Sequence, residues 1–251
     1  MRAQHRGASF RTRLIATHAV ALASLGLAVV AVGCGGGSSD AAPLTASGAA
    51  ATAPAPSPPR IRRWPIPYGA ARRRQMSAYS LRHYGEDTHR LSDPHVIVEH
   101  YTETRTAQEA WDTFAPDVPD NEFHELPNTC AHFLVEGDGR IDQLVPLTER
   151  CRHTTGLNWT AIGIENVGLS DGEILSDRAQ MRASLALTRW LQCRYRIALR
   201  NVIGHNESLS SPYHHDRVPA FQHQTHSDWN RTDMNRYRAL LARLPCPAGT
   251  D

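Results

Sequence analysis

The chain has 251 residues, of which 41% are hydrophobic and 21% charged, and its formal net charge is +2. Four arginines and no acidic residue lie in the first 33 positions, so the rest of the chain carries +2 less four charges, about −2. Nothing in this balance favours a nucleic-acid-binding protein, because such a protein presents a basic surface.

The first 33 residues are predicted to be a lipoprotein signal peptide. Arginines at the start precede an apolar run at 14–32, a pattern typical of secretion signals. Small residues stand directly before Cys34, which resembles a bacterial lipoprotein cleavage box and implies cleavage before Cys34 and its lipidation. A retained signal anchor is the alternative, because a membrane span needs roughly 20 apolar residues. Either way, we expect the protein to be exported and membrane-anchored, at the outer face of the cell membrane or in a periplasm.

Residues 34–60 are predicted to be a tether, and residues 61–251 a folded domain. The tether consists mainly of Gly, Ser, Ala, Thr and Pro, which cannot bury a core. Aromatic and aliphatic residues recur from Ile61 onward over about 190 residues, the usual size of one domain. Basic clusters at 60–63 and 72–74 are interpreted as solvated linker, with acidic lipid head groups or an anionic wall polymer as alternative partners.

Besides Cys34, the sequence contains four cysteines, an even number in a chain expected to be exported, where disulfides persist. Three pairings are possible. We favour Cys130 with Cys151 and Cys193 with Cys246, because each pair joins segments that can pack as neighbours. Zinc binding by these cysteines is disfavoured, because no CxxC spacing is present.

Helix and strand patterns alternate along the folded part. A capping-box spacing at Thr106 and Glu109 predicts a short helix. An Asp-Gly turn at 138–139 between two apolar runs predicts a β-hairpin. The remaining patterns predict strands at 95–102, 160–167 and 197–203 and helices at 177–195 and 234–244. Together they predict an α/β fold, with a mixed central β-sheet flanked by helices.

Two histidines at the ends of apolar runs are candidate metal ligands. His100 closes a β-branched run, and His205 follows Gly204 at the end of another. A catalytic zinc site takes three nitrogen, sulfur or oxygen ligands from the protein and leaves the fourth position to water. Either histidine alone would be interpreted as a polar cap of a strand, but imidazoles at neighbouring strand ends can converge on one point.

Five segments, in this order, resemble the successive motifs of a known family: VIVEHYTET, AHFLVEGDGRIDQLVP, CRHTTGLNWTAIGIENVG, VIGHNESL and QTHSDW. The family is that of zinc-dependent N-acetylmuramoyl-L-alanine amidases, which is related to phage lysozyme-type amidases and peptidoglycan recognition proteins. The resemblance covers about residues 94–229. It implies one amidase-type domain that binds Zn²⁺ and hydrolyses the amide between N-acetylmuramic acid and L-alanine in peptidoglycan, in cell-wall turnover or remodelling.

Two other functions are alternatives. Some relatives of the recognition proteins bind peptidoglycan or muropeptides without catalysis, and this chain departs from the family at one polar position described below. A zinc peptidase that cuts within the peptide stem is the other alternative, but the HExxH helix of the common metalloproteases is absent from the sequence. We expect a monomer in either case.

The resemblance also implies the metal ligands. His100 matches the first family ligand and His205 the second. The third position matches His226, although Asp228 is an alternative two residues on. The family has a lysine two positions before its third ligand, where this chain has Gln224, and the chain contains no lysine at all.

The remaining site residues are also implied by the resemblance. Glu165 matches the catalytic carboxylate that accepts a proton from the attacking water and returns it to the leaving amine. Glu99 is a poorer base, because strand alternation points it away from the side that His100 uses. His153 matches a residue of the substrate groove. Arg152 and Tyr101 are further substrate-binding candidates, and Arg152 or His153 is the candidate to replace the family lysine.

Overall fold

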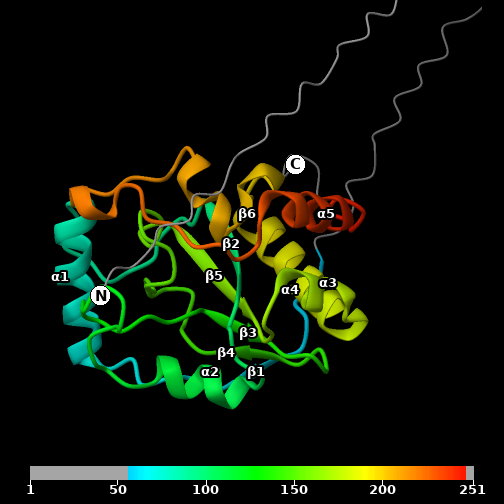
Figure 1. The fold of residues 1–251 in the computed structure, drawn as a ribbon, viewed down its shortest axis with the longest axis horizontal. Coiled ribbons are helices and arrows are strands. Elements are labelled where there is room, and N and C mark those ends of the chain that lie inside the picture. Colours follow the sequence, from blue (N-terminus) through cyan, green and yellow to red (C-terminus); the bar gives the residue numbers. More distant parts are fainter. Residues whose placement is uncertain (1–55, 247–251) are drawn as a thin grey trace, which may run out of the picture. The chain divides into compact units, whose positions relative to one another are not determined.

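The structure is a computed structural model that describes residues 56–246 (Figure 1). The predicted signal peptide at 1–33, the lipidation site Cys34 and the tether up to residue 55 lie outside the described residues. None of the helices within 56–246 is both long enough and apolar enough to cross a membrane.

A six-stranded sheet forms the centre of the described region. All neighbouring strands run parallel except β3 and β4, which are antiparallel. The order across the sheet is β1 (Ile61–Arg63), β4 (Ile141–Gln143), β3 (Phe133–Val135), β5 (Ala161–Asn166), β2 (Val96–Tyr101) and β6 (Val202–Gly204). With its flanking helices, this mixed sheet confirms the predicted α/β fold.

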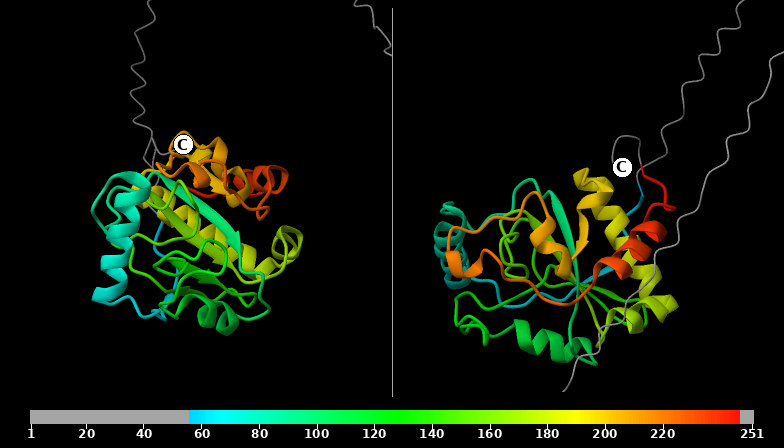
Figure 2. Two further views of the ribbon diagram at one scale, coloured as in Figure 1. Left: turned by 60° about the vertical axis from the view of Figure 1, so that its left-hand side comes forward. Right: turned by 45° about the horizontal axis from the view of Figure 1, so that its top comes forward.

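The helices lie on both sides of this sheet. α3, α4 and α5 lie together on one side, whereas α1 stands on the other side (Figure 1). A second view shows α1 well separated from the other helices (Figure 2). The bounds are α1 (Ala70–Tyr84), α2 (Ala107–Phe114), α3 (Asp171–Ser176), α4 (Arg178–Tyr195) and α5 (Arg231–Leu241), with short 3-10 turns η1 (Leu199–Asn201), η2 (His205–Ser210) and η3 (Pro219–Phe221).

Strand alternation sorts the side chains of β2 and β5 between the two faces of the sheet. Ile97 and Ile162 belong to the main core cluster, to which α4 contributes Leu187 and Leu191. Burying such aliphatic side chains stabilises the fold by about 1.5–3 kcal/mol each. The opposite face of the same strands is thereby left for polar side chains near the strand ends.

Several sequence predictions are confirmed. α2 has the predicted capping box, in which the Thr106 hydroxyl accepts from the Glu109 N–H at 3.2 Å. The predicted hairpin is β3 and β4. Both favoured disulfides, Cys130–Cys151 and Cys193–Cys246, are present.

Other elements differ from the prediction. Of the predicted strand at 197–203, only Val202 and Ile203 lie in the sheet, as part of β6, and Leu199–Asn201 is a 3-10 turn. α1 was interpreted in part as basic linker, but Arg72 in its first turn is 1% exposed. The Arg72 guanidinium donates to the carbonyl oxygens of Phe114 at 2.9 Å and of Asn128 at 3.1 Å. Within this run of arginines, Arg72 is therefore buried and holds α1 against the backbone of its neighbours.

Candidate active site

Three neighbouring strands bring polar side chains to one edge of the sheet. β2 lies between β5 and β6, and all three run parallel, so their carboxyl ends meet. His100 in β2 is the register partner of Glu165 in β5, and His205 follows β6. Glu99 points to the helical side instead, where it accepts from the Thr188 hydroxyl at 2.7 Å. Ligand sites in such sheets lie at the carboxyl ends of the strands.

The loop that carries Asp228 is held against this edge from two sides. The Asp171 carboxylate accepts from the backbone N–H groups of Trp229 at 2.8 Å and Asn230 at 2.9 Å. Trp229 also lies so close to Gly204 that a Cβ at Gly204 would overlap the Trp229 carbonyl oxygen. Only glycine permits this approach, which places Asp228 beside the two histidines.

His100, His205 and Asp228 form a buried group whose ligand atoms lie within 4.8 Å of one another. The Nδ1 atom of His100 lies 3.1 Å from one Asp228 oxygen, and the Nδ1 atom of His205 lies 3.3 Å from the other. Burial opposes ionisation of Asp228, but the hydrogen bonds to both histidines outweigh it and lower the pKa of the carboxyl. Burial lowers the pKa of His205 to about 4, so its imidazole is neutral at neutral pH.

This donor set fits a zinc ion. Two imidazoles and one carboxylate are ligands that catalytic zinc sites use, and three protein ligands leave one position open. The Nε2 atom of His205 is buried without a hydrogen-bond partner, and a neutral imidazole is the form that binds a metal. Within residues 56–246, no other set of histidine, cysteine and carboxylate side chains converges in this way.

His226, the third ligand implied by the resemblance, lies outside this group. Its ring stacks on that of His205, with centroids 4.6 Å apart and planes 14° from parallel. Its Nε2 atom lies 3.1 Å from a Glu122 oxygen, and both side chains are about half exposed. Asp228, the alternative, therefore lies beside both histidines, whereas the His226 ring lies alongside the group that these three residues form.

Glu165 lies beside the ligand group and lines the same cavity, which we call the central cavity; its walls also include Tyr101, His153 and Ser227. The side chain is buried, and its Oε2 atom has no hydrogen-bond partner. Burial raises the pKa of Glu165 to about 7, although the charge of nearby His100 opposes the shift. A carboxyl with this pKa can both accept and donate a proton near neutral pH.

The His153 side chain packs against His100. Its Nδ1 atom lies 3.2 Å from Nε2 of His100 and 2.9 Å from the Thr154 hydroxyl. Its ring covers Gly163 of β5, where a Cβ would collide with the imidazole. Burial and the neighbouring His100 keep the pKa of His153 well below its usual range. His153 therefore lines the central cavity and contacts His100.

The other two substrate-binding candidates differ in their surroundings. Tyr101 is half-buried and lines the central cavity. Arg152 also lines it but is 4% exposed, and its guanidinium donates to the Asp120 carboxylate at 2.9 Å and to the Glu125 carbonyl. The guanidinium of Arg152 is therefore already paired with Asp120, which argues against its replacing the family lysine.

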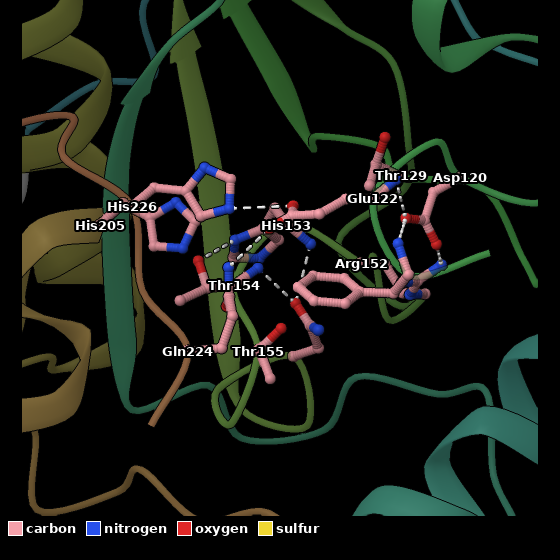
Figure 3. Close-up of a pocket in the computed structure, with 12 residues that line it drawn as sticks. Asp120, Glu122, Thr129, Arg152, His153, Thr154, Thr155, His205, Gln224 and His226 are labelled. Carbon is pink, nitrogen blue, oxygen red and sulfur yellow. Dashed lines mark hydrogen bonds and ion pairs between the residues drawn. The ribbon is translucent and has the colours of Figure 1, made fainter. Parts of the chain in front are cut away.

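A second cavity, which we call the side cavity, adjoins the first (Figure 3). His153, His205 and Arg152 line both. Five further wall residues have no signal in the sequence, because they come from irregular loops with no periodic pattern: Asp120, Glu122, Phe123, Thr155 and Asn158. Gln224 and His226, two positions that the family resemblance singles out, lie opposite, and His226 also lines the central cavity.

Comparison with known proteins gives one family match. Residues 90–237, more than half of the chain, match the family described as N-acetylmuramoyl-L-alanine amidase. The match includes every element of the site described above and begins after α1. No curated protein matches the sequence.

Solved structures give weaker likenesses. The endolysin N-acetylmuramoyl-L-alanine amidase LysCS from Clostridium intestinale URNW is 21% identical, over 60% of this chain and 84% of that chain, with a TM-score of 0.40. The amidase LysC from the same organism is 18% identical, over 73% and 98%, with a TM-score of 0.43. The amidase AmiD from E. coli, solved with an anhydro-N-acetylmuramic acid peptide, is 25% identical, over 47% and 50%, with a TM-score of 0.37. The family assignment rests on the sequence match alone.

Proposed function

Because the chain belongs to the N-acetylmuramoyl-L-alanine amidase family, we propose that it is a zinc-dependent peptidoglycan amidase that hydrolyses the bond between N-acetylmuramic acid and L-alanine. The observation that carries this proposal is the convergence of His100, His205 and Asp228 beside Glu165. A binding protein would need neither a three-ligand group nor a carboxyl with a raised pKa.

In this proposal His100, His205 and Asp228 hold the zinc. When bound, zinc supplies Lewis-acid polarisation of the amide carbonyl and lowers the pKa of water. The protein's contribution is to hold its ligands in the right protonation state. His153 and Thr154 contact the Nε2 side of His100, at 3.2 and 3.3 Å, so the ring presents Nδ1 to the ligand group. Such contacts orient a metal-binding histidine and fix its tautomer.

Glu165 performs the proton transfers. Its carboxylate accepts the proton of the attacking water and then donates it to the amine of L-alanine as the carbon–nitrogen bond breaks. The proton count is balanced, because the lactyl group gains the hydroxyl and the amine gains the hydrogen. A positioned carboxylate of this kind contributes about 10² to 10⁴ in rate.

The substrate lies in the central and side cavities. The central cavity contains the ligand group and Glu165, so the scissile amide must reach it. The side cavity opens beside His205 and is lined mainly by polar and charged residues, which suit sugar or peptide groups on one side of that amide. Whether intact wall or a released muropeptide fills it is decided by comparing turnover of the two.

Export and anchoring complete the proposal. The signal pattern at 1–33 and Cys34 support a lipoprotein, and two disulfides suit an oxidising compartment. In cells, the wild-type protein should carry lipid on Cys34 and fractionate with membranes. The Cys34→Ser variant should carry no lipid. If mass spectrometry of the purified wild-type protein shows Cys34 without a lipid, the lipid anchor is refuted.

The proposed activity is tested on purified peptidoglycan. We expect the full chain to release new L-alanine amino termini, to stop when a chelator removes its metal, and to recover with added zinc. Zinc bound at about one ion per chain without any release would favour the peptidoglycan-binding alternative. Release that survives the chelator would contradict zinc dependence.

A further inference from the structure

His83, near the end of α1, is buried between two carboxylates. Its side chain is 0% exposed. Its Nδ1 atom lies 2.8 Å from an Asp216 oxygen, and its Nε2 atom lies 3.0 Å from a Glu125 oxygen. A carboxylate oxygen only accepts, so both ring nitrogens must carry hydrogen for both bonds to form. His83 is therefore an imidazolium in this arrangement.

The two carboxylates belong to different loops. Glu125 lies in the segment at 115–129, between α2 and β3, which we call the first loop. Asp216 lies in the segment at 211–226, after η2, which we call the second loop. Figure 1 shows the second loop, in orange, running from beside β6 out to the end of α1 and back. His83 thus joins two loops that are distant in sequence.

The same two loops form facing walls of the side cavity. The first loop supplies Glu122 and Phe123, and the second supplies Gln224 and His226 (Figure 3). Phe221 links these walls to the histidine, because its ring lies 4.9 Å from that of His83 and 4.8 Å from that of Phe123. A displacement at His83 would therefore reach the cavity through packed groups.

α1 precedes the segment at 90–237 that matches the family. The contacts of His83 with the two loops therefore come from a helix outside that segment. The helix holds the first loop at a second point, where Arg72 donates to the carbonyl oxygens of Asn128 and Thr129, each at 3.1 Å. The two contacts lie at opposite ends of the helix. α1 thus spans the first loop, and its C-terminal end also reaches the second, through the His83 side chain and through Tyr84, whose ring lies 5.6 Å from that of His215.

We propose that His83 is a positioning residue for the substrate groove: its imidazolium ties both loops to α1 and thereby sets the separation of the side-cavity walls. This inference rests on the proposed function for its kinetic consequence but not for its structural one. His83 touches none of the groups that would meet the scissile bond, so we expect it to act on substrate binding rather than on bond cleavage.

The charge of His83 gives the arrangement a pH dependence. The bonds to Asp216 and Glu125 outweigh burial and raise the pKa of His83 above 6.5. The stabilisation is therefore complete below about 6.5 and is lost as pH rises through the raised pKa. Titratable and charged groups around the ring are Tyr79, Arg82 and Tyr84 from α1, Glu125 from the first loop, Asp216 from the second, and Arg152, which lies against Tyr79.

The test compares the full chain with its His83→Gln variant. Glutamine can donate to one carboxylate but cannot carry charge, so the link between Asp216 and Glu125 through one ring is broken, although Glu125 keeps its ion pair with Arg82. We expect faster amide hydrogen exchange in both loops, unchanged zinc content, kcat within about twofold, and KM for a soluble muropeptide raised about tenfold by the loss of one charge-assisted bond. After correction for intrinsic rates, wild-type exchange in the loops should increase as the pH rises through the raised pKa of His83, and that of the variant should not.

A variant on the opposite side of the sheet distinguishes a positioning role of His83 from a general loss of stability. Leu187→Ala opens a cavity under α4, where Leu187 is 0% exposed, and touches neither loop. It should lower thermal stability and leave KM unchanged. Unchanged loop exchange or unchanged KM in His83→Gln, or an equal rise of KM in Leu187→Ala, would overturn the inference. If the wild type releases no product at all, the proposed function fails, and loop exchange alone decides the role of His83.

Discussion

Asp228 and His226 lie two residues apart but occupy different environments. Asp228 is buried between the two ligand histidines, whereas His226 is half exposed and paired with Glu122. If Asp228 is the third ligand, the position two residues earlier, where the family resemblance has a lysine, is His226 rather than Gln224. The imidazole then stands in the place of the missing ammonium group, on the wall that both cavities share.

This division predicts opposite results for two alanine variants. Asp228→Ala should lose zinc and all activity, because only the two imidazoles remain as ligands. His226→Ala should keep zinc and lose about two- to tenfold in turnover, the worth of one hydrogen bond. Elemental analysis of both purified variants is the measurement. Loss of zinc from His226→Ala, with zinc kept in Asp228→Ala, would restore His226 as the ligand.

Glu165 gives a second prediction at this scale. Glu165→Gln should bind zinc as the wild type does and lose about 10² to 10⁴ in kcat, because the amide side chain cannot accept a proton. Glu99→Gln is the matched control, a buried carboxyl one residue from His100 that accepts hydrogen bonds from α4, α5 and Asn166 of β5. It should affect stability more than turnover. Full turnover in Glu165→Gln would move the base elsewhere.

The sequence predicts that His100 and Glu165 lie on the same side of the sheet, because both lie within regular strands where alternation fixes the side, and that His205 directly follows a third strand. It does not separate His226 from Asp228. Both lie in an irregular segment where spacing says nothing about direction, and only the contacts of Trp229 with Asp171 and Gly204 turn Asp228 inward.

Among the elements, the junction of β6 with η2 depends on one close approach. Any side chain at Gly204 would overlap backbone atoms of Trp229, which a rotamer change cannot relieve. Gly204→Ala should therefore shift the Asp228 loop, weaken zinc binding and cost about 1–3 kcal/mol of stability. Zinc titration and thermal unfolding measure both effects.

Gly172 in α3 provides the control for that variant. A Cβ there would meet nothing within 4 Å, and its helical position favours alanine by about 0.5–1 kcal/mol. Gly172→Ala should therefore be at least as stable as the wild type and bind zinc equally well. Equal behaviour of the two variants would mean that the approach of Trp229 to Gly204 does not position the site.

The elements that the sequence revealed share strong local signals. α2 has its capping box, α4 has Asp177 as N-cap at the predicted start, and the hairpin has its Asp-Gly turn. α1 lacked such signals: it has no side-chain cap and carries a run of arginines. Its buried face is made of Met76, Tyr79, Ser80, His83 and Tyr84 with Arg72, a mixture that no hydrophobic pattern distinguishes from a linker.

At the scale of the whole molecule, two disulfides hold segments on different sides of the fold. Cys130–Cys151 closes 21 residues beside the cavities, and Cys193–Cys246 closes 53 residues and ties the C-terminal segment to α4. Chain-entropy arguments give about 3 kcal/mol for the shorter loop and about 4 kcal/mol for the longer. Replacing Cys193 and Cys246 by serine should therefore cost more stability than replacing Cys130 and Cys151, as measured by denaturant unfolding.

The two pairs should differ in function. Cys130 and Arg152, which follows Cys151, line the central cavity, so removing the first disulfide should also raise KM. Removing the second should leave kinetic constants unchanged below the melting temperature. A larger kinetic effect from the Cys193 and Cys246 pair would mean that the C-terminal segment influences the site in a way that these contacts do not explain.

The most direct test of the central claim is to digest a defined muropeptide in water labelled with oxygen-18 and weigh both products. Hydrolysis of the lactyl amide predicts one labelled oxygen in the carboxylate of the muramic acid fragment and an unlabelled peptide with a free L-alanine amino terminus. Glu165→Gln should form both products about 10² to 10⁴ times more slowly. Label in a peptide carboxylate would instead identify a peptidase that cuts within the stem and would contradict the proposed amidase activity.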